Sequence, residues 1–305
     1  MSPERDAGTT TEPETPAAPD RAAMVDAVPP VGLVLGAIAS VQFGAALATT
    51  LFDELGAPGT VFLRVAFGAV VLAALWRPRV RDHARPELRL AALFGLALAA
   101  MNLSFYLSLE RIPLGVAVTI EFIGPLGVAV AASRRAIDAL WVVLAGAGVA
   151  LLSGGVATGT DPVGIALALL AGAFWAAYIL LSARVGRAFA GGDGLAVAMV
   201  VATVALLPIG VAEGGAALAE PALLAVGLAV GLLSSVIPYS LELEALRRIP
   251  AGTFGVLMSL EPAVAALAGF LVVGQRLATL QALAIALVVA ASAGAARGAR
   301  EPWLD

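Results

Sequence analysis

The sequence predicts an all-α polytopic membrane protein with ten transmembrane helices, arranged as two inverted repeats of five helices each. Three observations predict this class: an apolar composition, a regular succession of apolar stretches, and an internal repeat. Of the 305 residues, 60% are hydrophobic and 13% are charged, whereas soluble domains are roughly 45–50% apolar and about 25% charged. With a mean hydropathy of +0.96, the chain carries more apolar surface than a water-soluble fold can bury.

The first 29 residues differ from the rest of the chain. Residues 1–29 hold five prolines, six acids and two arginines, with hardly any apolar run. Such a segment cannot offset the entropy lost on ordering, so we expect an acidic, disordered tail on the cytoplasmic side. The tail also lacks the basic start and the cleavage site of a secretory signal, so the first apolar stretch is expected to stay as a membrane helix.

Ten apolar stretches follow, each of about 20 residues, which is enough to cross a hydrocarbon core of roughly 30 Å. Short polar or Gly/Pro-bearing breaks separate them, and no break is long enough for a soluble domain. The stretches lie near 31–52, 57–76, 90–108, 113–132, 136–153, 163–183, 194–211, 222–241, 251–273 and 278–296.

The two halves of this region resemble each other. Leu109 to Ala132 aligns without a gap onto Leu246 to Gly269, with eight identities in 24 positions, and both copies contain an Arg-Ile-Pro turn. Five helices per half would place the second half upside down in the membrane, and inverted repeats of this kind build secondary transporters. We therefore expect a first repeat over 30–154 and a second repeat over 155–305.

The arginines predict the orientation, because positive residues collect on the cytoplasmic side of membrane helices. All 18 basic residues are arginines. With ten helices and both termini inside, fifteen arginines fall in inside segments, two (Arg111 and Arg276) fall outside, and Arg64 falls within a helix. A different helix count would scramble this separation.

Arg64, Glu121 and Glu261 are the strongest candidates for a functional site, because a charge at the bilayer centre costs roughly 2.5–3.5 kcal/mol or more. Arg64 and Glu121 are expected at a similar depth, so they form either a buried pair that tethers two helices or a binding site for a zwitterion. Glu261 has no cation expected in its layer. It is a candidate proton carrier, or a carboxyl group hydrogen-bonded to a neighbouring helix. Glu121 is the second candidate for proton coupling.

Further polar residues and prolines fall inside the expected helices. A proline frees the carbonyl four residues earlier, so we expect helix breaks at Pro125, Pro238 and Pro262 that turn the carbonyls of Glu121, Ser234 and Met258 toward a polar interior, unless a nearby serine or water satisfies the kink. The other polar or aromatic residues either line a substrate cavity or make hydrogen bonds between helices. They are Gln42, Asn102, Tyr106, Trp175, Tyr178, Ser234, Ser235, Tyr239 and Ser259.

Enzyme and cofactor motifs are missing. The chain has no cysteine and one histidine, His83, within the arginine-rich loop 77–89, which we interpret as a topology signal that contacts anionic lipid heads. The Gly-rich segment 152–159 follows a membrane helix, not a strand, so it is no dinucleotide loop. Glu242, Glu244 and Asp138 are interpreted as residues at the membrane interface. No metal and no cofactor is predicted.

Several motifs closely resemble those of the threonine/homoserine exporters, which belong to the EamA branch of the drug/metabolite transporter superfamily. They include Met101-Asn102-Leu103-Ser104-Phe105-Tyr106-Leu107 and the segment from Leu109 to Leu126. In the second half they include Leu233-Ser234-Ser235, Pro238-Tyr239-Ser240-Leu241-Glu242, and the segment from Thr253 to Ala263.

The resemblance spans about residues 31–296. It implies ten helices, an inner-membrane location and proton-driven export of small amino acids. The formal net charge of −4 gives no basic field of the kind that nucleic-acid binders use, so no nucleic-acid partner is predicted. One departure is Gln275, where the family usually has a glutamate, and it casts doubt on a gating or coupling role at that position. Export of a drug or another metabolite remains an alternative, as does a membrane scaffold that transports nothing.

Overall fold

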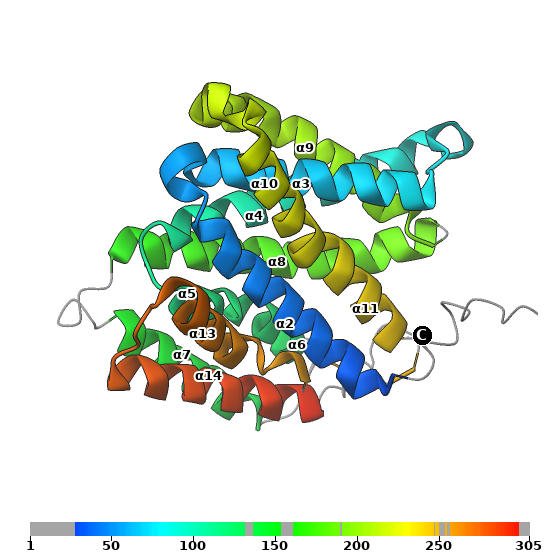
Figure 1. The fold of residues 1–305 in the computed structure, drawn as a ribbon. Coiled ribbons are helices and arrows are strands. Elements are labelled where there is room, and N and C mark those ends of the chain that lie inside the picture. The colour runs from blue at the N-terminus through cyan, green and yellow to red at the C-terminus, as the bar shows by residue number, and fades with distance from the viewer. Residues whose placement is uncertain are drawn as a thin grey trace, which may run out of the picture.

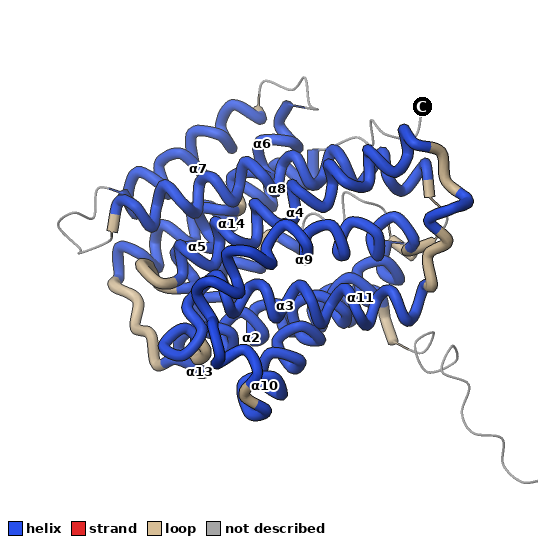
Figure 2. The backbone as a smooth tube through the Cα atoms, turned by 90° about the horizontal axis from the view of Figure 1, so that it is seen from above, coloured by secondary structure: helices blue, strands red, loops and turns tan. Residues whose placement is uncertain are grey.

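The computed structural model describes residues 28–131, 137–153, 161–189, 191–246, 248–249, 254 and 257–298. Within these ranges every regular element is a helix, and the helices pack side by side (Figures 1 and 2). Nearly all of the expected tail lies outside the described residues, as do Arg134, Arg135 and Arg247.

Six helical stretches in the described residues are long and apolar enough to cross a membrane. Three come from the first half of the chain and three from the second, and all coincide with expected stretches. They are α2 (Pro30–Thr49), α3 (Phe52–Trp76), α4 (Arg85–Leu109), α8 (Pro162–Ala188), α9 (Asp193–Gly214) with the turn to Ala219, and the stretch that begins with α10 (Pro221–Gly231).

The other four expected stretches contain helices that are shorter or, in the case of α14, have a shorter apolar part. The stretch expected near 113–132 is divided at Phe122, and the stretch near 251–273 is only partly described, with a turn at Ser259 and Leu260. The helices are α5 (Leu114–Glu121), α6 (Ile123–Ala131), α7 (Asp138–Ser153), α13 (Glu261–Val273) and α14 (Thr279–Gly298).

The three prolines give three different helix breaks. Pro125 lies in the first turn of α6, directly after the break at Phe122. Pro238 follows a π-helical segment, Leu232–Val236, that joins α10 to α11 (Ile237–Leu246). Before Pro262 the break is a turn at Ser259 and Leu260, after which α13 begins at Glu261. Pro262 thus lies in the first turn of α13, where a proline removes an N–H that has no helical partner.

The helices pack in a regular scheme. α3 lies along α9, α5 along α13, and α7 along α14 (Figure 1). In addition, α4 packs on α8 and α9, α11 packs on α2, and α10 packs on α3. α5 and α6 also contact α8, while α13 contacts α2.

Gln275 has a structural role at the end of α13. Gly274 adopts the left-handed conformation that ends the helix, with φ of 71°, and the N–H of Gln275 donates to the carbonyl of Gly269 at 3.1 Å. The Oε1 atom of Gln275 then accepts from the N–H of Leu114, the first residue of α5, at 3.0 Å. A glutamine satisfies this unpaired helix donor as a glutamate would.

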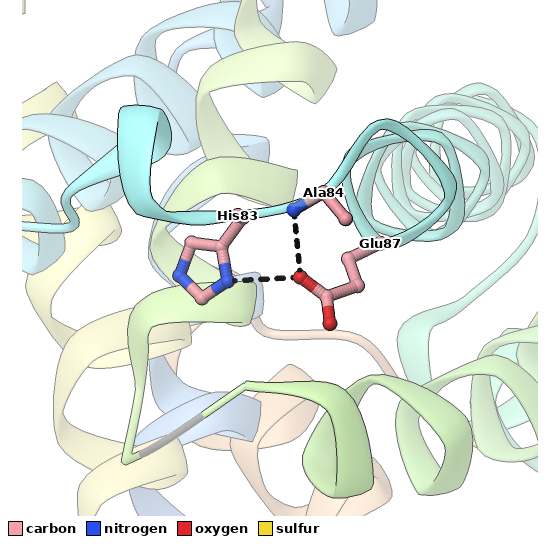
Figure 3. Close-up of polar contacts among 3 residues, drawn as sticks. All are labelled: His83, Ala84 and Glu87. Atoms are coloured by element: carbon pink, nitrogen blue, oxygen red, sulfur yellow. Dashed lines mark hydrogen bonds and ion pairs between the residues drawn. The ribbon is translucent and has the colours of Figure 1, made fainter.

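His83 packs at the start of α4. The Oε2 atom of Glu87 accepts from the N–H of Ala84 at 3.0 Å and lies 3.3 Å from Nδ1 of His83 (Figure 3). The His83 ring also stacks on Phe189, with 4.3 Å between ring centroids. These contacts join the arginine-rich connection between α3 and α4 to the end of α8.

Candidate functional site

A cavity of about 450 Å³ lies among the helices of both halves. That volume falls within the range typical of small-molecule sites. Most of the residues that the sequence singled out line it. They are Gln42, Arg64, Asn102, Glu121, Pro125, Trp175, Tyr178, Ser234, Pro238, Tyr239 and Glu261.

Arg64 projects from the middle of α3 and is only 6% exposed. Its Nη2 donates to the carbonyl oxygen of Ser234 at 2.9 Å, its Nη1 to the hydroxyl of Tyr106 at 3.3 Å, and its Nε to the hydroxyl of Ser235 at 3.4 Å. The guanidinium carbon also lies 5.4 Å from the centroid of the Tyr106 ring, within cation–π range. The buried charge is therefore held by four contacts with uncharged groups.

The π-helical segment supplies the acceptor for Arg64. The N–H of Ile237 donates to the carbonyl of Leu232, five residues earlier, and Pro238 has no N–H to donate. Two carbonyls of this segment receive side-chain donors instead. The carbonyl of Leu233 accepts from the Ser40 hydroxyl at 2.7 Å, and the carbonyl of Ser234 accepts from Arg64. The carbonyl of Ser234 was expected to turn toward a polar group, and it does so here.

The carbonyl of Glu121 has a different environment. A Cβ atom placed on Gly172 of α8 would lie 2.6 Å from this oxygen, and Gly124 approaches the carbonyl of Gly172 in turn. The break between α5 and α6 therefore packs backbone to backbone against α8. The freed carbonyl of Glu121 lies at a helix contact, while the Glu121 side chain lines the cavity.

Arg64 and Glu121 do not form the tethering ion pair that was one of the two interpretations. In the described residues no carboxylate makes an ion pair with Arg64. Both side chains are buried and both line the cavity. The cavity thus has a cation and a carboxyl group that are separate from each other.

Two more carboxyl groups line the same cavity. Glu261, at the start of α13, is 4% exposed, and its Oε2 atom has no hydrogen-bond partner in the described part of the chain. Glu242, on α11, was interpreted as an interface residue, yet it lines the cavity as well. Its position one helical turn after Pro238 and Tyr239 puts it on their helix face, a spacing that could have identified it.

Tyr106 and Ser259 were candidates either for the cavity lining or for hydrogen bonds between helices, and neither lines the cavity. Tyr106 is fully buried and contacts Arg64, and Ser259 is 1% exposed in the turn before α13. Pro262 is also absent from the lining. These residues can affect the site only through their neighbours.

The remaining walls are largely apolar. Phe122 and Trp175 meet edge to face, with 5.5 Å between ring centroids, and both line the cavity. Sequence reasoning found Trp175 but missed the apolar wall residues, because an apolar residue inside a membrane helix carries no signal that separates cavity from lipid. They are Val41, Ala45, Met101, Phe105, Val118, Phe122, Leu126, Ile179, Phe254 and Met258.

The lining offers the two signs of charge that a small zwitterion carries. One guanidinium and three carboxyl groups line the cavity of about 450 Å³, together with apolar side chains. In the part of the chain that the structure describes, no cluster of three or more His, Asp or Glu residues is arranged to hold a metal ion.

Known proteins match the chain over most of its length. Residues 162–297 match the model of the EamA-like transporter family. The threonine/homoserine exporters RhtA of Escherichia coli K12 and of Salmonella typhimurium LT2 are each 46% identical to the chain over 268 residues, which is 87% of this chain and 90% of theirs.

One solved crystal structure has the same fold. It is 17% identical in sequence, with a TM-score of 0.60, and the match covers 88% of this chain and 98% of that one. The RhtA relatives are named as transporters, not as enzymes. The chain therefore belongs to the EamA-like transporter family, in its threonine/homoserine exporter branch.

Proposed function

We propose that the chain is a secondary transporter of the inner membrane that exports small amino acids of the threonine and homoserine type. The observation that carries this proposal is the buried cavity that holds Arg64 apart from Glu121, Glu242 and Glu261. An α-amino acid needs one cation and one anion from its site. The RhtA relatives, which are named for threonine and homoserine, supply the substrate class.

Each charged group has a proposed role. Arg64 binds the substrate carboxylate, because a guanidinium is the best-suited donor for a carboxylate. Glu121 receives the ammonium group. Glu261 exchanges a proton and thereby couples export to the proton gradient, a role supported by its burial and by the absence of a partner in the described residues.

Alternating access requires two halves that move against each other, and the packing of the helices supports two inverted repeats, 30–154 and 155–305. If the ten expected stretches are counted in order, each stretch corresponds to the one five places later. The contact of α4 with α8 then matches that of α11 with α2, and the contact of α4 with α9 matches that of α10 with α3. The contacts α3 with α9, α5 with α13 and α7 with α14 each join a stretch to its own counterpart.

The proposed orientation has both termini in the cytoplasm, with the tail 1–29 inside. The arginine distribution supports it. In the structure, exposed arginines gather in the connection between α3 and α4 (Arg77, Arg79 and Arg81) and in the first two turns of α4 (Arg85 and Arg89). Arg111 pairs with Asp161, and the two residues lie in two connections that are both expected outside.

Reconstitution in liposomes tests the function. Purified protein should exchange radiolabelled homoserine across the bilayer and respond to an imposed pH gradient. Glu121→Gln should abolish transport while the protein still folds, and full activity of this variant would remove Glu121 from the site. If the wild-type protein exchanged neither threonine nor homoserine but did exchange another solute, that solute would replace them as the proposed substrate.

The coupling role of Glu261 has its own test. Glu261→Gln should still exchange homoserine for homoserine, because exchange needs no net proton movement, but its flux should no longer follow the pH gradient. Glu87→Gln, which removes an acid outside the cavity at the start of α4, should keep the response. A gradient response equal to that of the wild type in Glu261→Gln would exclude Glu261 from coupling.

A further inference from the structure

The guanidinium of Arg64 makes three hydrogen bonds and also lines the cavity. It has five N–H donors. Three of them point to Ser235, Tyr106 and the carbonyl of Ser234. One N–H on Nη1 and one on Nη2 have no partner in the described residues, and two such donors match the two oxygens of a carboxylate.

The three groups that hold Arg64 come from two other elements. Tyr106 belongs to α4 and is fully buried, and its hydroxyl and ring both contact the guanidinium. Ser234 and Ser235 belong to the π-helical segment and are 0% and 1% exposed. Since α3, α4 and this segment each supply one part, the direction of the guanidinium depends on all three.

Close packing brings the Ser235 hydroxyl to Arg64. A Cβ atom on Gly68, one turn after Arg64 in α3, would lie 3.2 Å from Cβ of Ser235, and a Cβ atom on Gly231 would lie 3.1 Å from the carbonyl oxygen of Arg64. Larger residues at either glycine would separate the two elements. The hydroxyl of Ser235 is thus held at hydrogen-bond distance by the backbone.

Neither Tyr106 nor Ser235 lines the cavity, so neither is placed to touch the substrate. We propose that Tyr106 and Ser235 are positioning residues, which aim the two open N–H donors of Arg64 at the carboxylate of the transported amino acid. This inference rests on the proposed function. It assigns the recognition of the carboxylate to a fixed orientation of Arg64, not to its charge alone.

Two substitutions remove the hydroxyls and leave the rest of the side chains: Tyr106→Phe and Ser235→Ala. With the full chain in liposomes, each should raise the KM for L-homoserine roughly tenfold, the size expected when a hydrogen bond to a charged group is lost, with little change in the maximal rate. Ser108→Ala is the matched control, because Ser108 is equally buried on α4 and its hydroxyl donates to the carbonyl of Phe105 in its own helix. Its KM should equal that of the wild type.

A ligand without a carboxylate distinguishes a loss of Arg64 orientation from general damage to the binding site. 3-Aminopropan-1-ol is homoserine without its carboxylate, and its competition with homoserine in the wild type sets the reference. In Tyr106→Phe and Ser235→Ala its inhibition constant should stay unchanged while the KM for homoserine rises, so the preference for homoserine over the amino alcohol should shrink.

Several results would contradict either this inference or the proposed function. A KM within twofold of the wild-type value in both variants overturns the proposal. A fall in maximal rate with an unchanged KM, or an equal weakening of homoserine and 3-aminopropan-1-ol, shows a merely structural role and also overturns it. Wild-type protein that neither binds nor transports homoserine would instead contradict the proposed function.

Discussion

The guanidinium of Arg64 donates a 2.9 Å hydrogen bond to the carbonyl oxygen of Ser234, which is 170 residues later in the chain. Ser234 lies in the π-helical segment before Pro238, where the helix has lost its regular hydrogen bonds. A backbone carbonyl at membrane depth needs a donor, and a buried arginine needs acceptors. The two residues therefore satisfy each other's hydrogen-bonding groups, and both line the cavity.

Replacing Pro238 tests this relationship. Pro238→Ala restores a backbone N–H that competes with Arg64 for the carbonyls of the π-helical segment, so Arg64 should lose its fixed position. We expect homoserine transport in liposomes to fall roughly tenfold, as for the loss of a charge-assisted hydrogen bond. Pro208→Ala is the control, because Pro208 is an exposed proline inside α9. Equal transport by the two variants would contradict the expectation.

Glu242 and Glu244 on α11 form a matched pair. Glu242 lines the cavity, whereas Glu244 forms an ion pair with Arg248 at the end of the helix. Glu242→Gln should change the KM for homoserine severalfold, since it removes one of the three carboxyl groups of the cavity. Glu244→Gln should leave the KM unchanged. Transport assays of both variants in liposomes of the same composition measure the two KM values. A larger change in KM for Glu244→Gln than for Glu242→Gln would show that the charge that matters for homoserine lies outside the cavity.

Gly172 should be intolerant of a side chain. Gly172→Ala places a Cβ atom 2.6 Å from the carbonyl oxygen of Glu121, and overpacking of this kind costs roughly 1–3 kcal/mol. Gly186, also on α8, has no atom within 4 Å of such a Cβ, so Gly186→Ala should be neutral or raise the stability of the helix. Thermal unfolding in detergent should show a lower Tm for Gly172→Ala alone, and equal Tm values would refute the close contact.

Asp161 makes a pH-dependent contribution outside the membrane-spanning segments. A hydrogen bond from Arg111 at 2.9 Å, and a second from the N–H of Val163, lower the pKa of the Asp161 carboxyl from its ordinary value of 3.8. A carboxyl group with a lowered pKa stabilises the fold above its ordinary pKa and loses this effect as the pH falls through the lowered value.

Asp161→Asn isolates the charge, because asparagine can still cap α8. The variant should have a lower Tm than the wild type at pH 7, and the difference should close as the pH falls through the lowered pKa of Asp161. Asp193→Asn, at the start of α9, serves as the control substitution. A Tm difference between Asp161→Asn and the wild type that persists unchanged in acid would show that the charge is not its source.

Much of the site could be predicted because charge and polarity are rare in this chain. Arg64, Glu121 and Glu261 are conspicuous in apolar stretches, and the cavity contains all three. Glu242 was missed because it lies near a helix end, where a carboxyl group is easily solvated. For Tyr106 and Ser259 the sequence left open whether they line the cavity, because polarity alone does not tell which way a side chain on a buried helix points.

The fold, like the site, could be predicted from the sequence only in part. Apolar length predicted where helices lie, but it did not predict that the segment before Pro238 becomes π-helical or that α13 starts at Glu261. A proline marks a weak point in a helix. The neighbouring donors, here Ser40 and Arg64, decide which irregular geometry is stable there.

The sequence by itself determined that this chain belongs in a membrane, where its helices lie and which three charges are costly to bury, because hydropathy and charge are local properties that add along the chain. Only the tertiary structure decided which groups meet. Arg64 contacts Tyr106, Ser234 and Ser235 without pairing with Glu121, since α3, α4 and the π-helical segment pack together over sequence separations of 42 to 171 residues. Hydrogen bonds form between groups that packing brings within about 3 Å, and that distance is a property of the packed helices.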